Sequence, residues 1–278
     1  MLIISREQIV NSGIADPRAA QQIIEQTFIQ KAHKKAVCAQ EIAMIPDRVE
    51  AGAFYSLPAY LEDANVAGIK WTTHVPKTGK NDSYTHPVIV LNELNTGVPI
   101  ALVEGQLISG LRTAAVSATA IKHLADPQAA SLLVCGSGFQ ARQQIKGVLP
   151  FLPHLQEIHF WSRNAAHAEQ MEQELSALLK PLKIKSRIHH ELPGRLDFAE
   201  IVIGVTSAST PYLNSSHFTK GHLYLHVGMR DIEAEAVEAF DEIVCDDFQS
   251  GVLTSNQSLF HWRESAKAWR PRQLYWNI

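Results

Sequence analysis

The chain has 278 residues, of which 46% are hydrophobic and 19% are charged. This length suffices for one large domain or two ordinary ones, and the composition excludes a disordered chain and a collagen. The formal net charge of −3 argues against an extended nucleic-acid-binding face. The longest apolar runs are strand-sized, as in 88-VIVL-91, so we expect no membrane-spanning segment.

Two features of the sequence predict a cytoplasmic protein. The first seven residues, MLIISRE, lack the basic start and long apolar stretch of a signal peptide. Cys38, Cys135 and Cys245 are few, odd in number and widely spaced. This usage predicts buried thiols in a reducing compartment rather than a disulfide framework.

The first part of the chain predicts a mixed α+β segment. A helix is expected over residues 16–34, and strands are expected at 52–57, 66–75, 87–93 and 98–105. The turn residues 95-NTG-97 would join the last two strands in an antiparallel hairpin. An Ala-rich helix over residues 113–125, with Thr113 as its cap, then ends this segment.

From about residue 129 to 247, strand and helix patterns alternate. Strands are expected at residues 131–135, 157–162, 186–190, 200–206, 222–227 and 241–246. Helices are expected over residues 139–152, 164–180 and 232–240. Strand–helix–strand alternation with short turns predicts parallel pairing in a doubly wound sheet. We therefore predict an α/β protein with two domains.

The predicted boundary lies near residues 125–130. Residues 1–125 would form an α+β domain, and residues 126–249 would form a domain with a doubly wound parallel sheet. Residues 250–278 could return to the first domain.

A glycine-rich loop directly follows the strand at 131–135 and opens the next helix. Its sequence, Gly136-Ser-Gly138-Phe-Gln-Ala141, has the spacing G-x-G-x-x-A. The glycines allow a tight turn and bring the helix N-terminus close to a pyrophosphate, and the small third residue allows helix–strand packing. A strand before it and a helix after it favour a dinucleotide site over a plain glycine turn.

The end of the second strand of this domain bears on the choice of cofactor. Sites for NAD usually place Asp or Glu there to accept from the ribose 2′-hydroxyl. This chain has 161-WSRN-164 instead, with Arg163 able to pair with a 2′-phosphate. The pattern favours NADP(H), while NAD(H) stays possible because Arg163 could instead stack on adenine or point into solvent.

Two cations stand out in the first part of the chain. The forked guanidinium of Arg112, at the predicted start of the Ala-rich helix, suits a carboxylate or phosphate. Lys70 lies inside the apolar strand 67-AGIKWTT-73, where it faces either a cleft or solvent. Neither residue decides a function alone.

Taken together, these residues resemble the ornithine cyclodeaminase/μ-crystallin family, from about residue 54 to 247. The resemblance lies in Lys70, 93-ELNTGVPIALVEG-105, 109-SGLRTAAVSATAIKHLA-125, the glycine loop and 160-FWSR-163. It implies an NAD(P)-dependent homodimer with a Rossmann domain and an α/β dimerisation domain, which interconverts amino acids and imines.

The resemblance also implies roles for individual residues. Arg112 would bind the substrate carboxylate, and Lys70 would be the catalytic-site lysine that also binds substrate. Thr85 would contact the cofactor or the site. The other implied cofactor contacts are Arg112, Thr113, Gly136, Ser137, Gly138, Phe139, Gln140, Ala141, Ser162, Arg163, Asn164, Val205, Thr206, Ser207, Gly228 and Met229.

The chain departs from the family pattern after its fifth Rossmann strand. Many members carry Gly-x-Asp there, but this chain has 226-HVGMRDI-232, similar to the branch that joins phosphoserine and glutamate in siderophore synthesis. Arg230 would bind an extra substrate carboxylate or phosphate. Asp231 would be a catalytic residue, or it would only cap the helix at 232–240.

Two further departures concern the ends of the chain. Gln40 stands roughly where many members have an arginine for the substrate carboxylate. Residues 263–278 take the place of the usual glycine-rich segment and closing helix. No metal is expected, because His189, His190, His222 and His226 lack a zinc-like spacing with cysteines or carboxylates.

The sequence therefore predicts an oxidoreductase that acts on the C–N bond of a small amino acid or its imine, with ketimine reduction ahead. The alternatives are an ornithine cyclodeaminase that forms proline and ammonia, and a synthase that joins two amino acids. A contrasting alternative is a non-catalytic NADPH-binding protein, since a fold can keep a cofactor and lose its chemistry.

Overall fold

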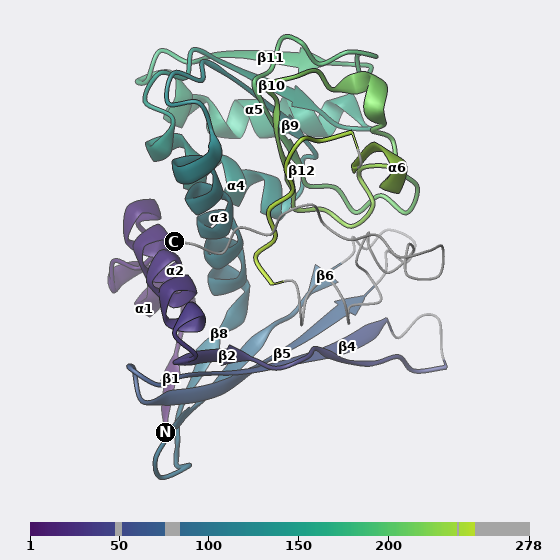
Figure 1. The fold of residues 1–278 in the computed structure, drawn as a ribbon. Coiled ribbons are helices and arrows are strands. Elements are labelled where there is room, and N and C mark those ends of the chain that lie inside the picture. Colours follow the sequence, from purple (N-terminus) through teal and green to yellow (C-terminus); the bar gives the residue numbers. More distant parts are fainter. Residues whose placement is uncertain (48–51, 76–83, 238, 248–278) are drawn as a thin grey trace. The chain divides into compact units, whose positions relative to one another are not determined.

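The computed structural model describes residues 1–47, 52–75, 84–237 and 239–247 (Figure 1). Contacts between residues divide the chain into two compact units. Among the described residues, the first unit comprises Met1–Arg112 and residues 245–247, and the second comprises Thr113–Val244. The division falls inside helix α3 (Gly105–Leu124), whereas the sequence places it after this helix. The reason is that Ala118 and Ile121 belong to the core of the second unit.

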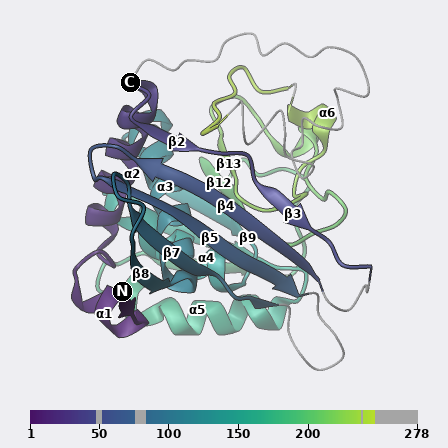
Figure 2. The same cartoon turned by 90° about the horizontal axis from the view of Figure 1, so that it is seen from below.

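The first unit is built on one mixed sheet, whose strands run side by side in Figure 2. The strand order is β1-β8-β7-β5-β4-β2, with β3 paired to β4 and β6 paired to β5. The strands are β1 (Leu2–Ile4), β2 (Ala36–Cys38), β3 (Ile42–Met44), β4 (Ala53–Leu61), β5 (Val66–Val75), β6 (Tyr84–Thr85), β7 (Val88–Glu93) and β8 (Pro99–Glu104). Two helices, α1 (Arg6–Asn11) and α2 (Pro17–Ala32), precede β2.

Local signals explain most of these elements. The predicted hairpin is confirmed as antiparallel β7 and β8, and Gly97 in its turn has a positive φ of 72°. Helix α2 begins after Asp16, whose side chain accepts hydrogen bonds from two N–H groups of the first turn. The Ala-rich helix was predicted to start at Thr113, which is wrong. It begins at Gly105, because the Glu104 carboxylate accepts the N–H groups of Gln106 and Leu107 and caps the helix there.

The second unit is a five-stranded parallel sheet, which confirms the predicted Rossmann-type fold. The order is β11-β10-β9-β12-β13, so the chain winds in opposite directions from β9. The strands are β9 (Ser131–Cys135), β10 (Glu157–Trp161), β11 (Lys185–His189), β12 (Ile201–Gly204) and β13 (Leu223–His226). The helices are α4 (Phe139–Val148), α5 (Ala165–Leu179) and α6 (Ala234–Val237), with 3-10 turns η2 (Leu149–Phe151) and η3 (Ser215–His217).

Two predictions for the end of this unit are wrong. The helix expected over 232–240 is the single turn α6, and no strand occurs in the described residues 239–247. Residues 245–247 belong instead to the first unit, where Asp247 forms an ion pair with Lys31 of α2 at 2.6 Å. Alternating apolar residues there had suggested a strand, but the segment has no strand partner.

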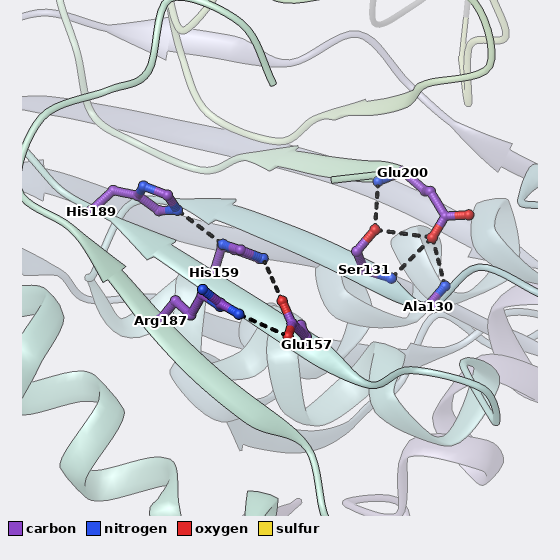
Figure 3. A network of polar contacts seen from close by, with 7 residues as sticks. All are labelled: Ala130, Ser131, Glu157, His159, Arg187, His189 and Glu200. Carbon is purple, nitrogen blue, oxygen red and sulfur yellow. Dashed lines mark hydrogen bonds and ion pairs between the residues drawn. The ribbon is translucent and has the colours of Figure 1, made fainter. Parts of the chain in front are cut away.

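The two faces of the parallel sheet differ in chemistry. One face is apolar, with Leu132, Val134, Ile158 and Phe160 fully buried in the cluster that includes residues of α4 and α5. The other face carries a polar network across β10 and β11 (Figure 3). There, His159 Nδ1 lies 2.9 Å from His189 Nε2, and His159 Nε2 lies 3.6 Å from Glu157.

The same network includes an exposed ion pair, in which Arg187 contacts Glu157 at 3.1 Å (Figure 3). The ring of His159 also packs on Phe198 with centroids 4.6 Å apart. At the amino-terminal ends of the neighbouring strands β9 and β12, the Glu200 carboxylate accepts the N–H groups of Ala130 and Ser131.

The sequence predicts that the three cysteines are buried thiols and that the chain has no membrane-spanning segment. Cys135 is buried as predicted, but Cys38 is exposed and Cys245 is half-buried, so the prediction of three buried thiols is wrong. All three are free thiols. Within the part of the chain that the structure describes, no helix has the length and apolar character needed to cross a membrane.

Candidate functional site

The glycine loop between β9 and α4 is shaped by its backbone. Gly136 has φ +129°, and a Cβ there would lie 2.6 Å from the carbonyl oxygen of Val205, so only glycine fits. Gly138 is the N-cap of α4, and no heavy atom of the described residues lies within 4 Å of a Cβ placed on it. Because glycine cannot cap with a side chain, the first N–H groups of α4 are left for an anion.

Neighbouring side chains hold this loop in place. Arg142 Nη1 donates to the carbonyl oxygens of Ser137 and Gly138, at 2.5 and 3.2 Å, while its Nε contacts Glu174 at 2.5 Å. The hydroxyl groups of Ser137 and Ser162 lie 2.9 Å apart. Two of the predicted cofactor residues, Ser137 and Ser162, thus link the ends of β9 and β10 to each other.

The residues after β10 have distinct positions. Asn164 accepts the N–H of Ala166 and caps α5, as the sequence predicts. Arg163 beside it has an exposed side chain. Since residues 161–164 contain no carboxylate, this strand end carries a cation where an NAD site usually carries an acid.

The remaining loop residues complete this edge of the sheet. Phe139 is 37% exposed, Gln140 is half-buried and Ala141 is fully buried against the core, as the small third residue of the motif requires. Val205 donates its N–H to the Cys135 carbonyl oxygen at 2.9 Å, which joins β12 to β9 at the point where the strand order reverses. In open α/β sheets, ligands bind at this reversal.

Asp231 lies inside the second unit rather than on its surface. Its side chain is 0% exposed, and its carboxylate accepts hydrogen bonds from the N–H and the hydroxyl of Thr206. A Cβ on Gly228 would lie 1.9 Å from Asp231 Oδ2, so this carboxylate requires glycine there. Burial raises the pKa of Asp231, and its hydrogen bonds oppose that rise. The carboxylate thus ties the end of β12 to the segment after β13. A role as helix cap alone would require hydrogen bonds to N–H groups of α6, but this carboxylate accepts hydrogen bonds from Thr206.

The other predicted residues near these strand ends are more open. Arg230 is half-buried, and its Nη1 lies 3.5 Å from the carbonyl oxygen of Ser209. Met229 is 40% exposed and Ser207 is exposed. All three lie beyond the carboxyl ends of β12 or β13, as the nucleotide site of this fold requires.

Lys70 lies on β5 in the first unit, on the face that helix α3 covers. It pairs with Leu57 on β4 and with Ile89 on β7, which in turn pairs with Val103 on β8. Paired residues point to the same side of a sheet. Ile89 and Val103 pack in a cluster with Leu107 of α3, so Lys70 shares this face.

Charge and burial set the electrostatics around Lys70. Burial, with a smaller contribution from Arg112, lowers the pKa of Lys70 to about 8, and Glu41 acts in the opposite direction. Surrounding protein atoms also lower the pKa of Arg112, although part of its side chain stays exposed. Asp246, Cys38 and Glu41 counteract that lowering. Lys70, Arg112, Glu41 and Asp246 therefore form one charged cluster in the first unit.

The sequence predicted only the two cations of this cluster. Glu41 directly follows Gln40, the position noted for its missing arginine, and Asp246 begins the acidic pair 246-DD-247. A carboxylate in the run 36-AVCAQEIAMI-45, whose other residues are apolar except for Gln40, was the available signal for Glu41. Thr85 pairs with His74 on β5, and Thr113 is half-buried inside α3.

No cluster of three or more histidine, cysteine, aspartate or glutamate side chains suited to a metal ion occurs in the described ranges. Residues 263–278, which take the place of the family's glycine-rich segment and closing helix, lie outside the described residues.

Comparison with protein families gives a match over most of the chain. The model described as "Ornithine cyclodeaminase/mu-crystallin family" matches residues 4–239. A relative from Staphylococcus aureus, named N-((2S)-2-amino-2-carboxyethyl)-L-glutamate dehydrogenase, is 26% identical over 89% of this chain and 75% of its own length. The Delta(1)-pyrroline-2-carboxylate reductase of Bacillus thuringiensis is also 26% identical, over 75% of this chain. This chain spans 64% of that reductase, which is less than two thirds of its length.

A solved structure supports the fold. The Delta(1)-pyrroline-2-carboxylate reductase of Thermococcus litoralis, in complex with NADH and L-proline, superposes with a TM-score of 0.84. The two sequences are 24% identical, and the match covers 96% of this chain and 81% of the other. At this level of identity, the likeness concerns the arrangement of elements.

Proposed function

Since the chain belongs to the ornithine cyclodeaminase/mu-crystallin family, we propose that it is an NAD(P)H-dependent oxidoreductase that reduces the C=N bond of a small imino acid. The observation that carries the proposal is that the two cations Lys70 and Arg112 belong to one charged cluster, in which Arg112 lowers the pKa of Lys70. The Staphylococcus aureus and Bacillus thuringiensis relatives are named as an N-((2S)-2-amino-2-carboxyethyl)-L-glutamate dehydrogenase and a Delta(1)-pyrroline-2-carboxylate reductase.

In this proposal, the cations of the first unit bind and protonate the substrate. The forked guanidinium of Arg112 suits a bidentate contact with the substrate carboxylate. Because its pKa is about 8, Lys70 is a proton donor well matched to neutral pH. It would protonate the imine nitrogen, or the amine that forms from it.

The second unit would hold the dinucleotide. The uncapped N-terminus of α4 and the glycines at 136 and 138 fit a pyrophosphate, because a side chain at either position would fill or distort the loop. When bound, the nicotinamide supplies the hydride. Arg163 favours NADP(H) over NAD(H), since no carboxylate after β10 would repel a 2′-phosphate.

Asp231 and Arg230 receive different roles. Asp231 is fully buried beneath Thr206 and Gly228, so we assign it to positioning the residues that would face the nicotinamide ribose. Arg230 is half-buried, and only the synthase alternative described below gives it an additional acidic group of the substrate to bind.

We further propose a homodimer formed through the face of the first sheet that lies opposite α3 (Figure 2). Ile42, Met44 and Trp71 on this face are 64%, 52% and 37% exposed, and Trp71 stacks on Phe54 at 5.8 Å. Exposed apolar side chains gathered on one sheet are typical of a protein interface. Sedimentation of the wild-type protein and of Trp71→Glu tests this proposal, which expects a monomer for the variant.

The amino-acid-joining synthase is the second candidate, because the Staphylococcus aureus relative is named for a product with additional carboxylates. The half-buried Arg230 is the observation that favours it. A synthase would require a second amino acid for turnover, whereas an imine reductase would not.

Absorbance at 340 nm tests the proposed reaction. The protein is mixed with NADPH or NADH and cyclic imino acids, and oxidation of the cofactor is the expected result. Ornithine with NAD tests the cyclodeaminase alternative. Cofactor binding without turnover of any substrate would favour the non-catalytic alternative.

The pH dependence tests the role of Lys70. Its pKa of about 8 predicts that kcat/KM is highest below pH 8 and falls about tenfold per pH unit above it, because the ammonium form is lost. In Lys70→Met this alkaline limb should be absent and turnover should be very low. An unchanged alkaline limb in a Lys70 variant would contradict the assignment.

A further inference from the structure

Glu41 lies close to Lys70 because of strand register. It sits in the short connection between β2 and β3, where the N–H of Ala39 donates to the Pro58 carbonyl oxygen at 3.0 Å and Ile42 pairs with Ser56. The connection therefore runs beside Leu57 of β4, which pairs with Lys70 on β5. Glu41 and Lys70 are thus separated by a single strand, and each influences the charge of the other.

A second carboxylate reaches Arg112 from the far end of the described chain. Asp246 is among the groups that act electrostatically on this guanidinium. Its neighbour Asp247 holds the segment to α2 through the 2.6 Å ion pair with Lys31. Two separate segments of the first unit thus bring carboxylates to the two cations.

The formal charges of this cluster sum to zero. Lys70 and Arg112 contribute two positive charges, and Glu41 and Asp246 contribute two negative ones. An arginine fork still binds one carboxylate well, because geometry and hydrogen bonding add to charge. A second substrate carboxylate would meet no uncompensated cation in the cluster and would approach Glu41 or Asp246.

We propose that Glu41, assisted by Asp246, restricts this site to imino acids that carry a single carboxylate and excludes those that carry two. A carboxylate of the protein repels a second carboxylate of the substrate, so the site selects its substrate by repulsion as well as by attraction. This inference rests on the proposed imine reduction and names its substrate class. It separates this chain from enzymes of the same fold whose substrates carry several acidic groups.

Two imines that differ in charge provide the test. The kcat/KM is measured for Δ1-pyrroline-2-carboxylate, with one carboxylate, and for iminosuccinate, with two. The wild-type protein should prefer the first by at least about tenfold, and Glu41→Gln should reduce that preference at least about tenfold, or about 1.4 kcal/mol. Asp246→Asn should act in the same direction and serves if Glu41→Gln does not fold.

Glu62→Gln is the matched control, because it removes the same charge from an exposed site in the same unit. Its preference should equal that of the wild type. A wild-type protein that reduces both imines equally, or a Glu41→Gln variant with unchanged preference, would overturn the inference and leave imine reduction standing.

Calorimetry separates this inference from the reaction itself. Binding of L-proline and L-aspartate is measured with NADPH present, for the wild type and Glu41→Gln. A gain in aspartate affinity in the variant supports charge selection even if no imine is reduced, in which case only the proposed function fails. Equal affinities for both amino acids in both proteins, without turnover, would overturn both.

Discussion

The two units build their candidate sites by different means. In the second unit, the loop at 136–141 and the strand ends near Thr206 and Gly228 shape the site mainly with backbone, and glycines decide what fits. In the first unit, the site is a cluster of charged side chains from four separate segments. A site shaped by backbone depends on the backbone conformation and is disturbed by an added side-chain atom. A cluster of charged side chains depends on equal numbers of positive and negative charges and is disturbed when one charge is removed.

The largest expected effect is the loss of Arg112. Arg112→Ala should lower kcat/KM by about two to three orders of magnitude. The substrate carboxylate would lose its bidentate partner, and Lys70 would be the one cation left in the cluster. Stopped-flow measurement of cofactor binding should show little change. Arg6→Ala, an exposed arginine of α1, is the control and should keep full activity. Normal turnover in Arg112→Ala would remove the first unit's cluster from the reaction.

The glycines of the loop provide the sharpest comparison within one site. Gly136→Ala should destabilise the protein by about 2–4 kcal/mol, because its φ is +129° and the new Cβ would lie 2.6 Å from a carbonyl oxygen. Gly138→Ala should keep its stability, because its φ is −82° and the position is open. Denaturant titration measures both.

Titration with NADPH measures the effect of the second glycine substitution on cofactor affinity. Gly138→Ala should bind NADPH at least about tenfold more weakly, since the added methyl group occupies the approach to the N-terminus of α4. Unchanged affinity in this variant would place the pyrophosphate elsewhere.

Acid should weaken the second unit through His159. Burial, with a contribution from His189, lowers the pKa of His159 to about 4, from 6.5 in an unfolded chain. The folded state therefore binds fewer protons, and stability is lost as the pH falls from 6.5 towards 4. The full loss is about 3 kcal/mol. His159→Phe should flatten this part of the Tm profile, whereas the exposed His154→Gln should not.

The smallest effect expected is a change of cofactor preference. Arg163→Asp should shift the ratio of kcat/KM for NADPH and NADH by about tenfold towards NADH, because the 2′-phosphate would meet a carboxylate instead of a guanidinium. An unchanged ratio would show that the exposed side chain of Arg163 takes no part in choosing the cofactor.

The same contrast explains what could be predicted from the sequence. The loop at 136–141, its strand and its helix are neighbours in the chain, so local spacing was enough to predict the fold of the second unit. Glu41 and Asp246 join Lys70 and Arg112 only through long-range register and the return of residues 245–247, which no local pattern contains. Helix α3 was predicted too short because a glutamate cap followed by Gly105 gives a weak start signal.

Helix α3 has a practical consequence for protein engineering. Its residues up to Arg112 belong to one unit and those from Thr113 to the other, and the helix is continuous across this point. A chimera that exchanged nucleotide units at residue 112 would cut through helical hydrogen bonds and leave each fragment with a frayed end. Junctions before Gly105 or after Leu124 keep the helix whole, and the donor of the helix then supplies both Arg112 and the residues that pack into the core of the transplanted sheet.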